Sequence, residues 1–249
     1  MNKLIAVIAA FLLCSASANP GKPTWARKAV AFPQICHDVS KSSSCKPRRI
    51  DAPDKQRYIE VIYKKTQLEE EQILEAVLRV TTPAKGTREV SLPDGFQNVD
   101  LLWSPDSTAF FVNGGNGGAY WGFWVYSYVA DDEDLKPIDI TRNAERDMIR
   151  TFPPCKATML SNEDCKSIES RPDYNMSGID WLPNSSVIVI MAEVPCSGIS
   201  GGIMCQVMGY EVTVRSGRIV KRLDARQLKK NWQGSMQWRF KVPDPPDYE

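Results

Sequence analysis

A single histidine, His37, occurs among the 249 residues, and this scarcity narrows the chemistry open to the chain. Serine and cysteine nucleophiles are most often activated by a histidine base, and zinc sites draw on cysteine and histidine at short spacings. His37 follows Cys36, but neighbours on an extended chain point to opposite sides. Acid–base catalysis would therefore depend on carboxylates, and no distinctive pair emerges among the 30 acidic residues. We expect a non-catalytic protein without a metal or cofactor.

Two further absences bear on location and partners. After residue 18, no apolar run approaches the ~20 residues of a membrane-spanning helix, so no membrane span is predicted. The formal net charge is +1, and loss of Lys3 with the signal peptide predicted below brings it to 0, because no other charged residue precedes Ala18. Proteins that bind nucleic acid usually carry a basic excess, so no nucleic-acid partner is expected.

The first 18 residues have the organisation of a secretory signal peptide. A short positive start ends at Lys3, an apolar run covers residues 4–13, and small residues occupy 16–18. We place the cleavage after Ala18 and expect a periplasmic or secreted protein. Lipidation at Cys14 is the weaker alternative, because a lipid-modified cysteine normally follows a small residue and Leu13 precedes this one.

The chain has seven cysteines, and the six that follow residue 18 form couples nine or ten residues apart. Six cysteines allow 15 pairings, but short spacings favour bonds within each couple. Each such bond would stabilise the fold by roughly 2–3 kcal/mol through the entropy of loop closure. The predicted disulfides are Cys36–Cys45, Cys155–Cys165 and Cys196–Cys205.

A repeat runs along the middle of the chain. Trp-Ser-Pro-Asp-Ser at 103–107 and Trp-Leu-Pro-Asn-Ser at 181–185 are each followed by an apolar strand, and a weaker copy starts at residue 51. Each copy reads as a proline-opened turn between two strands, and a second hairpin completes it. Four strands in roughly 45–50 residues are typical of a propeller blade. We expect the indoles of Trp103 and Trp181 to be buried at equivalent places.

These motifs resemble the blades of TolB-type and WD-type β-propellers over about residues 50–225. The resemblance implies structural roles, in the blade core and its first turn, for Trp103, Pro105, Asp106, Trp181, Pro183 and Asn184. Propellers usually need four to eight blades to close a ring. The predicted fold is therefore all-β, with about three four-stranded antiparallel propeller-like blades in an incomplete or irregular propeller, and with short helices in an insertion and near the C-terminus.

The chain divides into a signal peptide (1–18), an N-terminal wrapping segment (19–49), a β-propeller-like domain (50–242) and a flexible tail (243–249). Thr141 and Asp224 are predicted to cap helices that run to about Arg150 and Asn231. The alternating residues 236–242 predict a last strand.

Alternation of strand direction gathers the longer loops of the units at one face, where we predict the binding site. Tyr120 and Trp121 follow a Gly-rich loop and would serve as anchors; the alternative is that the aromatics of this strand fill both faces of a blade. The predicted partner-binding residues are Asn113, Asn116, Tyr120, Trp121, Ile199 and Ser200.

Two motifs are discounted. Gly-Ile-Ser-Gly-Gly at 198–202 matches the nucleophile elbow of serine hydrolases, but no histidine follows it. The acidic turn 131–134 lacks the alternation and glycine of a calcium loop and reads as a solvated turn.

The sequence thus predicts an exported, non-catalytic binding protein that engages a protein partner through disulfide-braced loops. A periplasmic inhibitor or immunity protein is one concrete version. A carbohydrate- or cell-wall-binding module that uses the aromatic strand, and a carboxylate-based hydrolase, stay open as alternatives.

Overall fold

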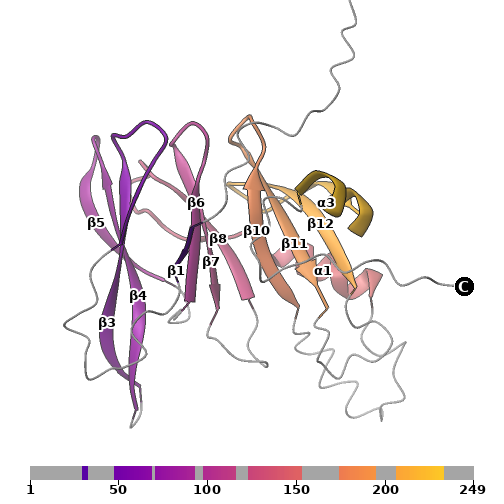
Figure 1. Cartoon of the computed structure of the whole chain (residues 1–249), viewed down its shortest axis with the longest axis horizontal. Coiled ribbons are helices and arrows are strands. Elements are labelled where there is room, and N and C mark those ends of the chain that lie inside the picture. Colours follow the sequence, from indigo (N-terminus) through magenta and orange to yellow (C-terminus); the bar gives the residue numbers. More distant parts are fainter. Residues whose placement is uncertain are drawn as a thin grey trace, which may run out of the picture.

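The computed structural model describes residues 30–32, 48–68, 71–92, 98–115, 123–152, 174–194 and 206–232. They form thirteen strands and two helices (Figure 1). The all-β class with short helices is confirmed. Neither of the two described helices is long and apolar enough to cross a bilayer.

Three antiparallel units of four strands follow one another along the chain. Unit 1 consists of β2 (Arg48–Asp51), β3 (Tyr58–Leu68), β4 (Glu71–Thr82) and β5 (Gly86–Ser91). Unit 2 consists of β6 (Asn98–Trp103), β7 (Ala109–Gly115), β8 (Phe123–Val129) and β9 (Ile138–Asp139). Unit 3 consists of β10 (Asn175–Trp181), β11 (Val187–Glu193), β12 (Val207–Thr213) and β13 (Ile219–Leu223).

Unit 1 is a separate sheet, whereas units 2 and 3 are connected into one nine-stranded sheet. The connection is a single parallel residue pair, Phe123 of β8 with Asn175 of β10. The ninth strand is β1 (Val30–Phe32), which lies antiparallel to β6. Part of the predicted N-terminal wrapping segment therefore extends the edge of unit 2.

The first turn of every unit has the same geometry. In unit 2 the Ser107 N–H donates to the Ser104 carbonyl oxygen at 3.0 Å, and corresponding bonds of 3.0 Å close the turns of units 1 and 3. The last residue of each turn is left-handed, with φ of 61° at Lys55, 65° at Ser107 and 56° at Ser185. The weak first sequence copy thus shares the turn of the two clear copies.

The units pack face to face, and each interface is an apolar layer. On β7 the successive rings of Phe110 and Phe111 point to opposite faces, toward unit 1 and unit 3 respectively, and both are fully buried. This period of two is intrinsic to a strand, and it explains why the central strands are apolar without alternation. A third apolar layer joins the far face of unit 3 to α3 (Ala225–Trp232), with Leu228 at its centre.

Polar contacts repeat between neighbouring units. Trp103 and Trp181 are 3% and 1% exposed, which confirms their predicted burial. Each indole Nε1 donates to a carbonyl oxygen of the preceding unit, from Trp103 to Ile50 at 3.3 Å and from Trp181 to Leu102 at 3.2 Å. The turn serines act similarly: Ser107 and Ser185 accept from the N–H groups of Asp54 and Asp106 at 3.0 and 3.1 Å.

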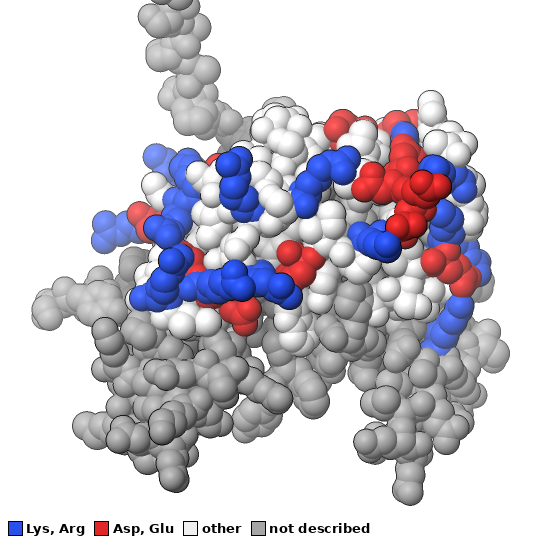
Figure 2. Space-filling model, turned by 180° about the vertical axis from the view of Figure 1, so that it is seen from behind, with Lys and Arg blue, Asp and Glu red and all other residues white. Residues whose placement is uncertain are grey.

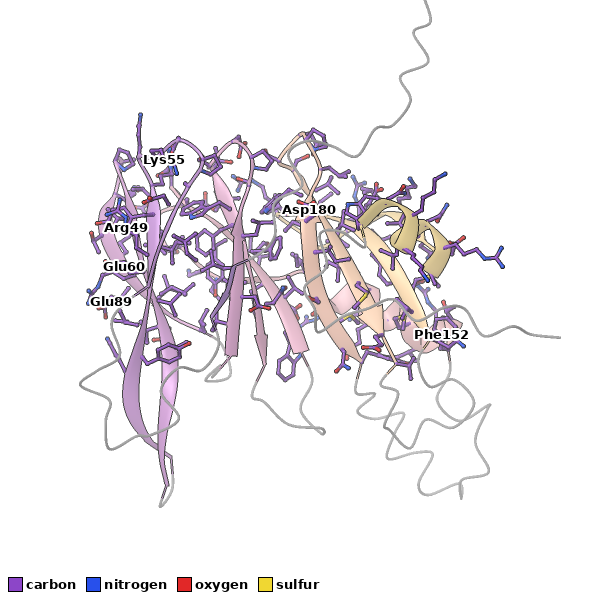
Figure 3. All side chains as sticks on the ribbon, in the orientation of Figure 1. Arg49, Lys55, Glu60, Glu89, Phe152 and Asp180 are labelled. Carbon is purple, nitrogen blue, oxygen red and sulfur yellow. The ribbon has the colours of Figure 1, made fainter. Side chains whose placement is uncertain are left out.

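The outer faces of units 1 and 3, at the two ends of the stack of sheets, differ in polarity. The outer face of unit 1 carries pairs of charged side chains that point away from the molecule (Figure 3). Arg49 pairs with Asp51 at 2.7 Å, and Glu89 accepts from Lys64 at 2.6 Å and from Arg79 at 2.9 Å. The outer face of unit 3 is apolar, and α3 covers it.

The two helices begin where the sequence indicated, but only one has the predicted cap. The Asp224 side chain accepts from the Gln227 N–H at 2.8 Å, and the Gln227 Oε1 accepts from the Asp224 N–H at 2.9 Å. The cap at Thr141 was wrong: no side-chain bond caps α1 (Arg142–Thr151). Instead the Thr141 N–H and hydroxyl both donate to Asp139, at 2.9 and 2.6 Å, because a carboxylate two residues away is the stronger acceptor.

Several predicted features lie outside the described residues. They are the signal peptide at 1–18, the last strand at 236–242, the tail at 243–249, and the cysteines Cys36, Cys45, Cys155, Cys165, Cys196 and Cys205.

Candidate functional site

One edge of the molecule is a continuous row of paired strand ends. Neighbours in this row face each other in the strand register, from unit 2 into unit 3. The segments 116–122 and 195–205, which hold most of the predicted partner-binding residues, begin and end beside it. We term this row the loop edge, and its residues are Asn98, Gly115, Phe123, Asn175, Glu193 and Val207.

Asn113 is the one predicted partner-binding residue that the structure describes. Its side chain docks unit 2 on unit 3: Oδ1 accepts from the Gly178 N–H at 2.7 Å, and Nδ2 donates to the Gly178 carbonyl at 2.9 Å. A β-carbon on Gly178 would lie 2.8 Å from the ring of Phe111, so this close approach needs glycine. A role of Asn113 in binding stays a prediction, as it does for Asn116, Tyr120, Trp121, Ile199 and Ser200, which lie outside the described residues.

Glu193, at the loop edge, was not predicted as a site residue from the sequence. Burial raises the pKa of its carboxyl above the ordinary value, and a bond from Asn175 at 3.4 Å only partly opposes this. A carboxyl in such a setting retains its proton closer to neutral pH and can donate as well as accept a hydrogen bond. The available signal was an acidic residue that directly ends the apolar run 187–192.

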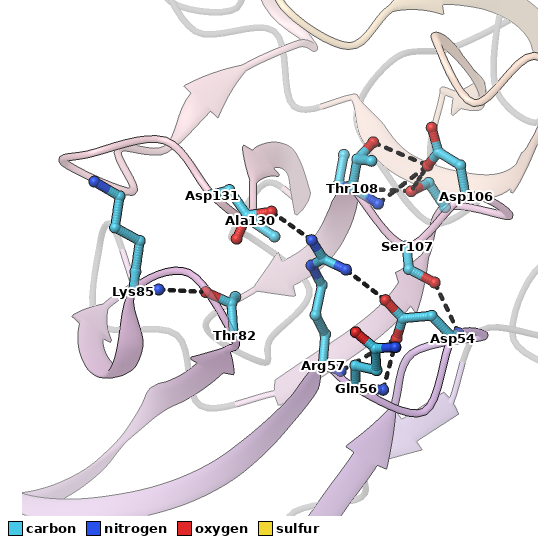
Figure 4. Close-up of polar contacts among 12 residues, drawn as sticks. Asp54, Gln56, Arg57, Thr82, Lys85, Asp106, Ser107, Thr108, Ala130 and Asp131 are labelled. Carbon is cyan, nitrogen blue, oxygen red and sulfur yellow. Dashed lines mark hydrogen bonds and ion pairs between the residues drawn. The ribbon is translucent and has the colours of Figure 1, made fainter.

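At the opposite edge, which is formed by the short turns, polar side chains bond one unit to the next (Figure 4). Arg57 donates to Asp54 at 2.5 Å and to Asp131 of unit 2 at 2.6 Å. Arg88 donates to the Ala130 carbonyl at 2.5 Å. Burial alone would raise the pKa of Asp131, but bonds from Arg57 and Thr82 and the charge of Arg57 hold it below the ordinary value. We term this the turn edge.

The predicted solvated turn at 131–134 is thus correct only in part. Residues 132–134 are exposed, whereas Asp131 forms part of the joint between units 1 and 2. Among the described residues no group of acidic, histidine or cysteine side chains is arranged to hold a metal ion.

A groove of about 1020 Å³ lies between α1 and β13, on the face shown in Figure 2. Lys and Arg side chains gather on the side of this face where unit 3 and the two helices lie. Five of the lining residues are Lys or Arg, and none is acidic. The groove is lined by Asn143, Arg146, Ile149 and Arg150 of α1 and by Arg218, Ile219, Val220, Lys221 and Arg222.

A buried carboxylate organises this groove. Asp147 is 2% exposed and accepts from Arg150 of its own helix at 3.0 Å and from Arg222 of β13. The groove was not predicted from the sequence, although a signal existed: Arg142, Arg146 and Arg150 recur at every fourth residue, which places them on one helix face.

The sequence matches no known protein-family model and no curated protein. The assignment of the site therefore depends on its geometry.

Proposed function

We propose that the protein is an exported, non-catalytic binding protein that engages a protein partner at the loop edge. The observation that carries this proposal is the row of paired strand ends from Asn98 to Val207. Because these ends are adjacent, the segments 116–122 and 195–205 start and end side by side, and we propose that both contact one ligand. Aromatic anchors surrounded by small polar residues are the usual composition of a binding hot spot.

The turn edge supports the same choice by contrast. Its charged side chains, Arg57, Arg88 and Asp131, are already bonded across the joint between units 1 and 2. A partner that recruited these side chains would have to break contacts that hold units 1 and 2 together.

We further propose that the three units are propeller-like blades in an open arrangement, as the resemblance to TolB-type and WD-type blades implies. In a ring, every blade packs its faces on two neighbours. Here the charged outer face of unit 1 and the helix α3 on unit 3 occupy the places where further blades would pack. Terminal repeats with polar or capped outer faces are the usual solution in open repeat proteins.

The predicted disulfides complete this proposal. A loop closed by Cys196–Cys205 loses less conformational entropy on binding than an open loop of equal length. Such pre-organised loops, on a protein exported to the periplasm or beyond the cell, suit an inhibitor or immunity protein.

Glu193 favours one alternative, a carboxylate-based hydrolase. A carboxyl with a raised pKa can act as a general acid. The mechanism also needs a second carboxylate at the loop edge. Turnover of a cell-wall preparation by the mature protein, lost in Glu193→Gln, would establish that alternative in place of the binding function.

Affinity capture with matched variants tests the proposed function. Tagged chain 19–249 is incubated with periplasmic extract of the source cells, alongside the Tyr120→Ala and Trp121→Ala variants. The control is Asp134→Ala at the turn edge, where the side chain is exposed and, among the described residues, bonds only to Lys136 at 2.6 Å. We expect a partner that the loop-edge variants bind at least ~10-fold more weakly and the control retains. A partner lost only in Asp134→Ala would contradict the proposal, as would recovery of glycan alone.

A further inference from the structure

The groove between α1 and β13 follows the open edge of a strand. It is lined by Arg218 and by four successive residues of β13, Ile219–Arg222. Alternate side chains of a strand point to opposite faces, and the register shift at Val220 displaces this pattern by one residue only, so a surface that reaches four successive strand residues runs along the strand's edge. Among the described strands, β13 pairs only with β12, which lies on its other side. Such an edge presents backbone groups that another extended chain can bond.

The charge of the groove favours an acidic ligand. Asp147 and Glu211 are the acidic residues that pair with its cations, so five positive against two negative charges leave +3. Arg150, Lys221 and Arg222 remain 71%, 55% and 59% exposed despite their pairing. Arg146 and Arg218 are exposed, and their guanidinium groups form no ion pair or hydrogen bond within the described part of the chain.

An apolar strip lies between these charges. Val220 is 47% exposed and is the large hydrophobic residue left exposed among those the structure describes. It lines the groove together with Ile149 and Ile219. A ligand that matches the groove therefore carries apolar side chains among acidic ones.

The walls of the groove are fixed before any ligand arrives. Ala144 and Met148 anchor α1 in the layer between units 2 and 3, where both are fully buried. Asn143 donates to the Gly217 carbonyl at 2.9 Å, which ties the start of the helix to the hairpin before β13. At the other end Arg222 spans from β13 to Asp147. A pre-formed groove lowers the ordering cost of binding.

We propose that this groove binds an extended acidic segment of a partner protein, which adds a strand to the edge of β13 while its carboxylates meet Arg146 and Arg218. Five strand residues span roughly 17 Å, so the segment is about five residues long. A peptide is favoured over a nucleic acid, because a sugar–phosphate backbone cannot continue a β-ladder and offers nothing to Val220. This site is separate from the loop edge, so either can fail without the other.

The test uses fluorescence anisotropy with the labelled peptide Asp-Leu-Glu-Val-Asp and the full mature chain. The charge reversal Arg146→Glu with Arg218→Glu should weaken binding about tenfold or more at low salt, because it replaces attraction to the peptide's carboxylates by repulsion. The fold should be retained, because neither guanidinium forms an ion pair or hydrogen bond within the described residues. The matched control, Lys85→Glu with Lys230→Glu, reverses two exposed charges outside the groove and should bind the peptide as the wild type does. Equal affinity of both double variants would overturn the proposal.

A second probe isolates the backbone contribution. The same peptide carrying N-methyl groups at alternate residues retains its charge but cannot donate along a ladder. Weaker binding by one of the two alternating patterns supports strand addition, and unchanged binding by both patterns would overturn it. Tighter binding of a single-stranded oligonucleotide than of the peptide, lost in the same charge reversal, would reassign the groove to nucleic acid. Tighter peptide binding after neutralisation of Asp244, Asp247 and Glu249 would reassign it to the chain's own tail.

Discussion

The indole Nε1 of Trp181 donates a hydrogen bond to the carbonyl oxygen of Leu102, 3.2 Å away in the preceding unit. Trp103 makes the equivalent bond to Ile50 at 3.3 Å. Each tryptophan therefore fills an apolar layer and satisfies a polar group across it, so the motif sets the contact between units as well as the core of one unit.

This relationship predicts matched effects on stability. Trp103→Ala and Trp181→Ala should each lower the free energy of unfolding by about 3–5 kcal/mol, because each removes a buried indole. Trp181→Phe retains most of the packing and loses the bond to Leu102, so it should cost clearly less than Trp181→Ala. Urea unfolding followed by circular dichroism measures all three. An alanine variant with unchanged stability would show that its unit does not depend on the motif.

Two of the turn residues with positive φ allow the cost of backbone strain to be measured apart from the contribution of contacts between units. Lys55 has a φ of 61°, and its exposed side chain makes no bond across units within the described residues. Lys55→Gly should therefore stabilise by about 0.5–1 kcal/mol. Ser185→Gly relieves the same strain but removes the acceptor of the Asp106 N–H, which costs about 1 kcal/mol. Thermal unfolding should rank Lys55→Gly above Ser185→Gly, and the reverse order would contradict the role given to the serine hydroxyl.

The ion pairs of Arg57 with Asp54 and Asp131 predict that the fold becomes less stable in acid. Burial opposes ionisation of Asp54 and Asp131, but hydrogen bonds, including those from Arg57, lower both pKa values below the ordinary value of 3.8. A lowered pKa in the folded state contributes stability above the ordinary value, and this contribution is lost as the pH falls through the folded pKa. Arg57→Ala should cost about 1–3 kcal/mol at pH 7, with a shrinking difference from wild type below about pH 4. Arg57→Lys, which has one ammonium in place of the two-pronged guanidinium, should be intermediate.

Glu193 predicts the opposite dependence on pH. Its pKa is raised by burial, so the folded state binds a proton more readily than the unfolded state does. Stability contributed at this site is highest below the ordinary value of 4.5 and falls as the pH rises through the raised pKa. Glu193→Gln should melt at a higher temperature than wild type at pH 7 and at nearly the same temperature at pH 4. A lower melting temperature of Glu193→Gln at pH 7 would contradict the raised pKa of this carboxyl.

Much of the fold follows from local patterns in the sequence. The proline turns, the hairpin at Ser216–Gly217 and the buried strand Val187–Ile190 could all be predicted, because turn chemistry and apolar runs act over a few residues. Thr141 misled because a hydroxyl usually caps a helix, whereas the nearby Asp139 carboxylate binds that hydroxyl instead.

The site was harder to predict, because its contacts join distant residues. Asn113 bonds Gly178 across 65 positions of sequence, and Asp147 meets Arg222 across 75. Spacing along the chain carries no information about such pairs. The basic groove needs both α1 and β13 in place before its charges converge.

Hydrogen–deuterium exchange, measured on the protein alone and in complex with its captured partner, locates the partner on the surface of the protein. If the partner binds the loop edge, exchange should slow in peptides that cover residues 113–123 and 193–207 and stay unchanged in peptides that cover 54–57 and 130–136. Protection confined to 54–57 and 130–136 would place the partner at the turn edge and contradict binding at the loop edge.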